Sequence, residues 1–301
     1  MSASKMHDDE VHTDASLVRR LLTAQFPQWA ELPIAPVPSA GTDNALYRLG
    51  ENMVVRLPRI DWAVADVEKE QRWLPRLAPH LPLAIPMPLA LGAPGEGYPW
   101  RWSIYRWLTG ENATVARIAD QDRAARDLAQ FTTALRQIAT KDWPLPEPPV
   151  ASRGVPLATR DAETRAATAS LEGALDTDAV SAAWEAALKA PAWNGPPVWI
   201  HGDLSPLNLL VEQGRISAVI DFGALGVGEP ACDLMPAWNF FSAQTRRVFR
   251  AALAVDDATW ARGRGWALSI GLIALPYYQH TNPVLANIAR RAIAEVLADE
   301  A

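Results

Sequence analysis

The sequence has almost no cysteine, no long apolar run and no excess of basic charge. Cys232 is the single cysteine among 301 residues, which excludes an intramolecular disulfide framework and a zinc site built on several cysteines. The most apolar late stretch, residues 266–278, is shorter than the ~20 residues of a membrane span and contains a proline. The 34 acidic and 28 basic residues give a net charge of −6. We therefore expect neither a nucleic-acid-binding protein nor a membrane protein.

The N-terminal residues do not have the pattern expected of a signal peptide. The first 14 residues are polar and lack the apolar segment of a signal peptide, so we expect a flexible N terminus and a cytoplasmic protein. No repeat of fixed period is present. The length allows one large domain or two lobes.

The first third of the chain combines short strands with helices. Residues 14–25 and 63–77 have helical spacing, and Glu70 shares the apolar face of the second segment with Val67 and Leu74. Apolar runs bounded by turn-forming residues predict strands at 34–37, 45–49, 53–57 and 102–108. We expect residues 1–107 to form a strand-rich N-terminal lobe.

The remainder of the chain is predicted to be mainly helical. Apolar residues recur at helical spacing over 124–138 and 285–296, and residues 162–190 contain one or two further helices. Residues 143–149 contain four prolines, which predicts a loop. Residues 108–301 are therefore expected to form a helical C-terminal lobe, and together the two lobes define an α+β fold.

One segment of the C-terminal lobe, residues 198–235, has the pattern of a β element that carries catalytic groups. Two short apolar runs, 209–211 and 216–220, are joined by a polar turn and predict a hairpin. Because a hairpin returns the chain to its starting end, Asn208 before it and Asp221 after it should lie close together. Asp203 is five residues before Asn208, so three oxygen-bearing side chains should converge.

These three side chains suit magnesium-dependent phosphoryl transfer. Carboxylate and amide oxygens are ligands that Mg²⁺ accepts together with phosphate oxygens. In the kinase pattern H-x-D-x-x-x-x-N followed by D-F-G, the first Asp is the base, and the Asn and second Asp hold the metal. Either motif alone is uninformative, since each occurs in ordinary turns. In this sequence both motifs occur, in this order and on either side of the predicted hairpin. Together they favour Asp203 as catalytic base and Asn208 and Asp221 as Mg²⁺ ligands.

The same segment resembles the aminoglycoside phosphotransferase family, which comprises small-molecule kinases of the protein-kinase-like fold with macrolide and choline kinase relatives. The likeness extends from about Pro36 onward and is most specific over residues 198–235. The run Gly-Glu-Pro-Ala-Cys-Asp-Leu at 228–234 is similar to the family's Gly-Asp-Pro-x-x-Asp-Leu, with Glu229 in place of Asp. The resemblance implies a two-lobed fold, ATP or GTP as phosphoryl donor, and a small-molecule hydroxyl as acceptor.

The resemblance also implies roles for residues outside the motif. In the nucleotide-binding lobe, Arg56 stands where the fold usually has a phosphate-contacting Lys, and Glu70 matches its helical partner. Further nucleotide contacts are implied for the Ser39 and Thr42 hydroxyls and for the backbone at Arg106 and Leu108. In the catalytic loop, His201 and Asp233 are implied to be structural supports.

The acceptor is expected to be a small molecule: an aminoglycoside, a macrolide or a related antibiotic or metabolite. The residues of the C-terminal region favour one of low charge, such as a macrolide or another sugar-bearing metabolite. Only eleven residues separate Asp221 from Asp233, which leaves little room for the peptide-binding segment of a protein kinase. From Asp233 to the C terminus, seven arginines outnumber six acids, an unfavourable balance for a polycationic aminoglycoside. This region also contains six aromatic residues that could line an acceptor pocket, although most are expected in the core: Trp238, Phe240, Phe241, Trp266, Tyr277 and Tyr278.

Two other classes of protein can be compared with these features. Arg56 and the glycine-poor loop at 38–44 suit a nucleotide-binding pseudokinase module without turnover. A hydrolase fits poorly, because the sequence has neither a G-x-S-x-G elbow nor an H-E-x-x-H helix. The preference for ATP or GTP, the oligomeric state, and a role in antibiotic resistance or in metabolism stay open.

Overall fold

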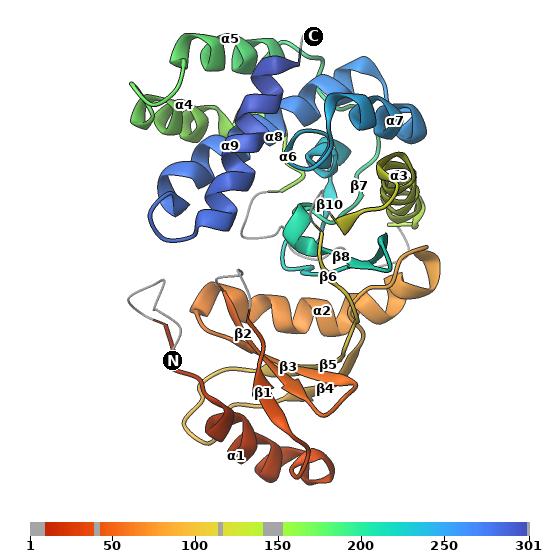
Figure 1. The fold of residues 1–301 in the computed structure, drawn as a ribbon, viewed down its shortest axis with the longest axis vertical. Coiled ribbons are helices and arrows are strands. Elements are labelled where there is room, and N and C mark those ends of the chain that lie inside the picture. The colour runs from red at the N-terminus through yellow and green to blue at the C-terminus, as the bar shows by residue number, and fades with distance from the viewer. Residues whose placement is uncertain (1–9, 39–42, 114–116, 141–152, 300–301) are drawn as a thin grey trace. The chain divides into compact units, whose positions relative to one another are not determined.

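The structure is a computed structural model that describes residues 10–38, 43–113, 117–140 and 153–299. The chain divides into two compact units. Unit 1 comprises residues 1–79 and 84–109, and unit 2 comprises residues 80–83 and 110–301 (Figure 1). None of the helices in the described ranges is long and apolar enough to cross a membrane.

Unit 1 is built on an antiparallel five-stranded sheet in the order β1-β2-β3-β5-β4. Its strands are β1 (Ile34–Pro36), β2 (Asn44–Leu49), β3 (Met53–Pro58), β4 (Pro88–Gly92) and β5 (Trp102–Arg106). The four predicted strands are confirmed with small shifts at their ends, whereas β4 was not predicted. Strand β4 begins with a proline and lies at the edge of the sheet, where a missing N–H is tolerated.

The two helices α1 (Ala15–Gln25) and α2 (Val64–Leu77) cover opposite faces of this sheet (Figure 1). Alternation along β3 assigns Val55 and Leu57 to the core beneath α1 and turns Arg56 toward α2. The predicted inward face of the second helix is confirmed, because Val67, Glu70 and Leu74 are all buried.

The segment before α1 is fixed to unit 1. The Val11 N–H donates to the carbonyl of Arg59, and the Glu10 carboxylate forms an ion pair with the Arg59 guanidinium. The Tyr47 hydroxyl donates to the Thr13 hydroxyl at 3.0 Å. The described part of the polar N terminus, from residue 10 onward, is thus attached to the sheet by its own hydrogen bonds.

Unit 2 is mainly helical, as predicted. The helices that the structure describes are α3 (Gln121–Gln137), α4 (Asp161–Ser170), α5 (Thr177–Leu188), α6 (Pro236–Asn239), α7 (Ala243–Leu253), α8 (Asp257–Tyr278) and α9 (Pro283–Ala298). Short 3₁₀ turns occur in both units: η1 (Pro27–Trp29), η2 (Asp61–Ala63), η3 (Ala78–His80), η5 (Leu157–Arg160), η6 (Pro206–Asn208) and η7 (Pro230–Leu234). The loop predicted at residues 143–149 lies outside the described residues.

Two small antiparallel sheets hold the motif-bearing segment of unit 2. Strand β7 (Val198–Ile200) pairs with β10 (Gly226–Gly228), and the order β6-β8-β9 joins β6 (Glu111–Asn112), β8 (Leu209–Glu212) and β9 (Arg215–Val219). The predicted hairpin is therefore confirmed.

Most aromatic side chains considered for an acceptor pocket belong to the core of unit 2. Trp238, Phe240, Phe241 and Trp266 are each at most 2% exposed. Tyr277, near the end of α8, is 54% exposed. The four buried rings stabilise the helical packing by burying apolar surface, so they offer no surface to an acceptor.

Candidate active site

The hairpin brings the ends of the two motifs together. Leu209 of β8 pairs with Val219 of β9, and the Ile220 N–H donates to the Asn208 carbonyl at 2.8 Å. Asn208 and Asp221 thus flank the open end of the hairpin, as the sequence predicts. The spacing alone produces this placement, because Asn208 directly precedes the paired position Leu209 and Asp221 follows the paired position Val219 by two residues.

Asp203 and Asn208 are in direct contact. The Asn208 Nδ2 donates to the Asp203 carboxylate oxygen Oδ2 at 2.9 Å and to the Asp203 backbone carbonyl at 2.8 Å. The Asn208 side chain is buried, and both bonds use its amide nitrogen. Its Oδ1 accepts no hydrogen bond from the described residues, so this oxygen is available as a ligand.

Charged neighbours act on the Asp203 carboxylate from two directions. Desolvation by the surrounding protein raises the pKa of Asp203. The positive charge of Arg153 opposes this rise, and the negative charge of Asp221 adds to it. Arg153 Nη2 lies 3.9 Å from Asp203 Oδ1. The Asp203 side chain is still 42% exposed, which a base that must meet a substrate hydroxyl requires.

Asp233 holds the catalytic loop through the backbone. Its carboxylate is fully buried and accepts the N–H groups of His201 at 2.9 Å and of Gly202 at 2.7 Å. Gly202 has φ +82°, and a Cβ there would lie 2.5 Å from the Ala224 carbonyl oxygen. The sharp turn before Asp203 therefore requires glycine.

His201 is a buried hydrogen-bonded residue. Its Nδ1 accepts the Asp203 N–H at 3.2 Å, and its Nε2 lies 3.1 Å from the Ile220 carbonyl. These partners assign the proton to Nε2. The ring also contacts Phe222 edge-on at 4.6 Å between centroids. His201 thus connects the loop before Asp203 to the segment that contains Asp221.

The donor set near the hairpin fits a magnesium ion. Asp221 is exposed and has φ +62°, a left-handed conformation that is uncommon for residues other than glycine. Asn208 supplies an amide oxygen, and Asp221 supplies a carboxylate. The described residues contain no group of three or more His, Cys, Asp or Glu side chains arranged for a metal. Mg²⁺ needs only one or two protein carboxylates, because phosphates and water complete its shell.

Unit 1 contains the second predicted pair, Arg56 and Glu70. The Arg56 Nη1 donates to both Glu70 oxygens, at 2.5 and 2.6 Å, and the carboxylate also accepts the Tyr105 hydroxyl at 2.5 Å. Burial raises the pKa of Tyr105, and the Glu70 charge adds to this rise. Another carboxylate of α2, Glu68, is exposed and pairs with Arg101 at 3.0 Å. The structure therefore pairs Arg56 with Glu70 and directs Glu68 to solvent.

The remaining predicted nucleotide contacts are only partly described. Ser39 and Thr42 lie outside the described residues. At the end of β5, the Arg106 N–H donates to the Met87 carbonyl at 2.9 Å. The Trp107 N–H donates to the Asn52 carbonyl at 2.8 Å. Within the described chain, the Leu108 N–H has no backbone partner of this kind. Of these three N–H groups, that of Leu108 is therefore the one left to donate to a purine.

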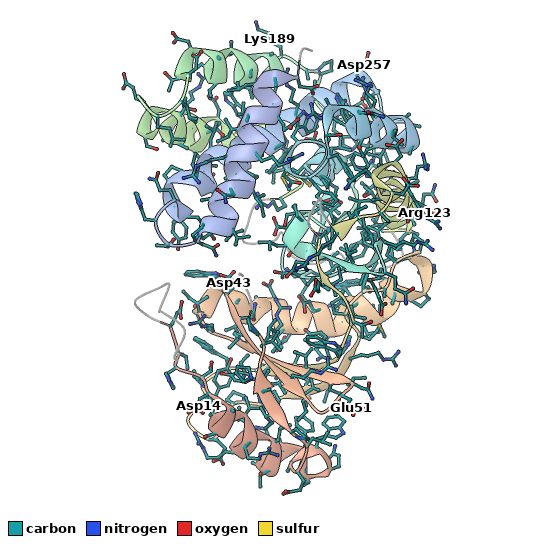
Figure 2. The ribbon with its side chains drawn as sticks, viewed as in Figure 1. Asp14, Asp43, Glu51, Arg123, Lys189 and Asp257 are labelled. Atoms are coloured by element: carbon teal, nitrogen blue, oxygen red, sulfur yellow. The ribbon has the colours of Figure 1, made fainter. Side chains whose placement is uncertain are left out.

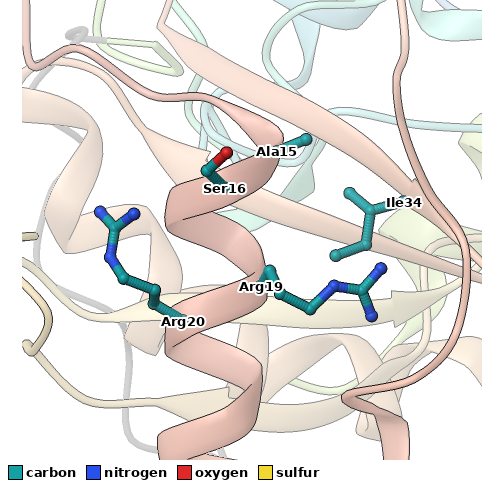
Figure 3. A pocket seen from close by; sticks show the side chains of 5 residues that line it. All are labelled: Ala15, Ser16, Arg19, Arg20 and Ile34. Atoms are coloured by element: carbon teal, nitrogen blue, oxygen red, sulfur yellow. The ribbon is translucent and has the colours of Figure 1, made fainter.

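A surface pocket in unit 1 lies apart from these residues. It has a volume of about 450 Å³ and is lined by Ala15, Ser16, Arg19, Arg20 and Ile34 (Figure 3). These residues belong to α1 and β1, and none of them is a predicted site residue. The guanidinium of Arg19 is already bound to the Ala30 carbonyl. We assign no chemistry to this pocket.

Sequence reasoning missed Arg153 and one buried ion pair. Arg153 belongs to no recognisable motif, and its approach to Asp203 depends on the tertiary fold. The Glu229 carboxylate pairs with Arg262 of α8, and both side chains are at most 5% exposed. Their contact joins the motif segment to α8. The substitution of Glu229 for Asp was visible in the sequence, but its partner was not.

The antiparallel sheet of unit 1 and the helical unit 2 with its motif-bearing hairpin define a protein-kinase-like fold. Residues 35–266 match the profile of the phosphotransferase enzyme family, which includes the aminoglycoside phosphotransferases. The chain belongs to this family. The predicted family and fold are thereby confirmed.

Known relatives agree with this assignment. An aminoglycoside 3'-phosphotransferase from Escherichia coli is 34% identical over 79 residues, which cover 25% of this chain and 29% of that protein. The GDP complex of an aminoglycoside 2'-phosphotransferase-IIIa has a TM-score of 0.73 at 19% identity, covering 95% of this chain and 99% of that chain. Macrolide 2'-phosphotransferase MphH from Brachybacterium faecium, solved as the apoenzyme, has a TM-score of 0.58 at 25% identity, covering 94% and 99%.

Proposed function

We propose that the protein transfers the γ-phosphoryl group of ATP or GTP to a hydroxyl of a small molecule. The observation that carries this proposal is the hydrogen bond between Asp203 and Asn208 at the end of the hairpin that Asp221 closes. A turn with a purely structural role does not need an exposed carboxylate such as that of Asp203 beside both the Asn208 amide and the Asp221 carboxylate. Related structures that hold GDP, ADP or ATP support a nucleoside triphosphate as donor. A cytoplasmic location, where ATP and Mg²⁺ are available, belongs to the same proposal.

Asp203 is the base in this proposal. Its Oδ2 is fixed by Asn208, so Oδ1 remains to accept a hydrogen bond from the acceptor hydroxyl. Hydrogen bonds from the loop to Asp233 and His201 hold the carboxylate in place. Most of the rate would come from positioning and from neutralisation of charge. Asn208 Oδ1 and the Asp221 carboxylate would hold Mg²⁺, which when bound would supply positive charge against the phosphates of the nucleotide.

The experiment that tests the proposal is a screen for acceptors. The full chain would be incubated with Mg²⁺, ATP or GTP, and a panel of aminoglycosides, macrolides, amino alcohols and polyols. Release of ADP or GDP would be followed, and phosphate esters would be identified by ³¹P NMR. We expect Mg²⁺-dependent formation of a phosphate ester.

We also expect Asp221→Asn to raise the Mg²⁺ concentration for half-maximal activity by roughly tenfold or more, because it removes an anionic ligand.

A matched control for this screen is Asp257→Asn. Asp257 lies at the start of α8 in unit 2, is 98% exposed and pairs with Arg250 (Figure 2). This variant should keep the wild-type Mg²⁺ dependence. Tight nucleotide binding without any ester or nucleoside diphosphate would contradict the proposal and favour a pseudokinase module.

Arg56 is proposed to contact the nucleotide phosphates while Glu70 orients it. A hydrogen bond to a charged group contributes ~1.5–3 kcal/mol. We therefore expect Arg56→Met to weaken ATP or GTP binding by roughly 10- to 100-fold, and Arg56→Lys to lose less because it keeps the charge. Binding would be measured by calorimetry on variants shown to be folded by circular dichroism.

The control for Arg56 is Arg101→Met, which removes another arginine of unit 1. Arg101 is half exposed and pairs with Glu68 on the surface. Its loss should leave nucleotide affinity within about twofold of the wild type, because exposed pairs contribute little. Unchanged affinity in Arg56→Met would show that Arg56 has only a structural role.

A further inference from the structure

Arg153 is a cation beside the proposed base that the motif does not account for. Its Nη2 lies 3.9 Å from Asp203 Oδ1, longer than a hydrogen bond, and its side chain is only 15% exposed. Its Nε is buried, and no described residue accepts a hydrogen bond from it. Asp203 is also the one carboxylate within 4.0 Å of this guanidinium in the described part of the chain. The cation therefore retains donors for a ligand.

The backbone beside Arg153 is fixed by a close approach of two glycines. Gly154 has φ +70°, and a Cβ there would lie 2.5 Å from the Ile200 Cδ1. Its carbonyl accepts the Glu229 N–H at 2.7 Å, and a Cβ on Gly228 would lie 2.3 Å from the same oxygen. Glycine at both positions allows this contact. The backbone that carries Arg153 is therefore held against the β7–β10 sheet.

The two oxygens of Asp203 have different neighbours. Oδ2 accepts the Asn208 amide, which places it on the side of the proposed metal ligands. Oδ1 faces Arg153. An acceptor hydroxyl that donates to Oδ1 would therefore lie next to the guanidinium. A carboxylate or phosphate on the same acceptor, within a few bonds of that hydroxyl, would reach Arg153 and form charge-assisted hydrogen bonds.

The described acidic side chains of the C-terminal segment, from residue 233 onward, are engaged by other groups of unit 2. Asp233 binds the loop amides, and Asp256 caps α8. Glu295 and Asp299 at the end of α9 both pair with Arg246, which is 4% exposed. Asp257 pairs with Arg250 at the surface. Every described acid from residue 233 onward thus has a partner, whereas Arg153 has unused donors.

Resting on the function proposed above, we infer that Arg153 determines acceptor specificity and that the acceptor is a hydroxy compound carrying a carboxylate or phosphate near the reacting hydroxyl. A polycationic acceptor is disfavoured, because it would place positive charge against Arg153. Recognition of a planar oxyanion suits arginine, whose donors form a fork that matches carboxylate and phosphate geometry.

The test uses matched acceptors that differ in one terminal group, which is negative, neutral or positive. The trio of gluconate, glucitol and 1-amino-1-deoxyglucitol shares one polyol chain with an acid, a neutral group or an amine at its end. Glycerate, glycerol and 3-amino-1,2-propanediol form a shorter trio. Each compound would be titrated calorimetrically into the full chain loaded with Mg²⁺ and a non-hydrolysable ATP analogue. The analogue fills the γ-phosphate position, so an acid cannot bind there.

We expect the wild type to bind the acid of at least one trio at least tenfold more tightly than the matching amine. Arg153→Gln should remove this preference, and Arg153→Lys should keep part of it. The control Arg165→Gln removes a half-exposed arginine on α4 that pairs with Asp161 and Glu185, and it should keep the full preference. Thermal unfolding would verify that each variant is folded.

Two results would overturn the inference. One is a wild type that binds neither acid more tightly than its amine, including the case in which none of them binds. The other is an Arg153→Gln variant that weakens the ATP analogue relative to ADP but keeps the acid preference, which would assign Arg153 to the transferred phosphoryl group. In both cases, Mg²⁺-dependent nucleotide turnover by the wild type would leave the proposed function intact. Absence of that turnover would refute the proposed function itself.

Discussion

Asp203→Asn is expected to lower kcat by roughly 10²- to 10⁴-fold, the contribution typical of a positioned general base. The amide keeps the shape of the side chain and its place beside Asn208 but cannot accept the hydroxyl proton. Nucleotide affinity should change little, because Asp203 is not among the proposed phosphate contacts. The measurement is steady-state kinetics with the acceptor found in the screen, together with nucleotide titration. Loss of affinity with unchanged kcat would contradict the role of base.

A control separates loss of the base from loss of the fold. Asp127 lies on α3 and pairs loosely with Arg123 and Arg215 on the surface. Asp127→Asn removes a carboxylate of the same unit, and its kcat should stay within about twofold of the wild type. Activity in Asp203→Asn close to that of this control would assign the proton acceptor elsewhere.

Asp233→Ala is expected to destabilise unit 2 by roughly 3–5 kcal/mol, as is typical when one partner of a buried charged network is removed. The substitution leaves the N–H groups of His201 and Gly202 without their acceptor. It also removes a negative charge near the half-buried Arg136. Desolvation lowers the pKa of Arg136, and the Asp233 charge opposes this fall. Urea denaturation followed by tryptophan fluorescence would measure the change.

The comparison for Asp233 is a carboxylate that binds only one backbone group. Asp256 caps α8 by accepting the Thr259 N–H at 2.6 Å. Asp256→Ala should cost about 1 kcal/mol, the usual value for a helix cap. Equal effects of the two substitutions would show that Asp233 is an ordinary cap rather than the anchor of the catalytic loop.

The core of the candidate site was predictable because its geometry is local. Asn208 and Asp221 lie within two residues of paired strand positions of one hairpin, and Asp203 is a turn away, so the spacing alone brings them together. Glu70 was predictable for a similar reason, because helical spacing places it on the buried face of α2. In each case the regular geometry of one hairpin or one helix determines which side chains meet.

Contacts between distant segments could not be read in this way. Arg153 reaches Asp203 only because Gly154 packs against Gly228 and β7, and no residue spacing encodes that approach. Helix α8 was missed as a complete element because its glycines and Pro276 oppose helix formation. Its packing explains the glycines, since a Cβ on Gly263 or Gly265 would lie within 3 Å of Leu234 or Leu157. Tertiary packing outweighs local propensity there.

The left-handed backbone of Asp221 limits how its presence in other sequences can be interpreted. At φ +62°, side chains other than those of Asn, Asp and Gly cost free energy in the native state. A descendant of this chain that had lost all turnover would therefore still favour these three residues at that position. Asp203 carries no such backbone restriction. Survival of Asp203 through mutational drift is accordingly the more informative sign of an active enzyme.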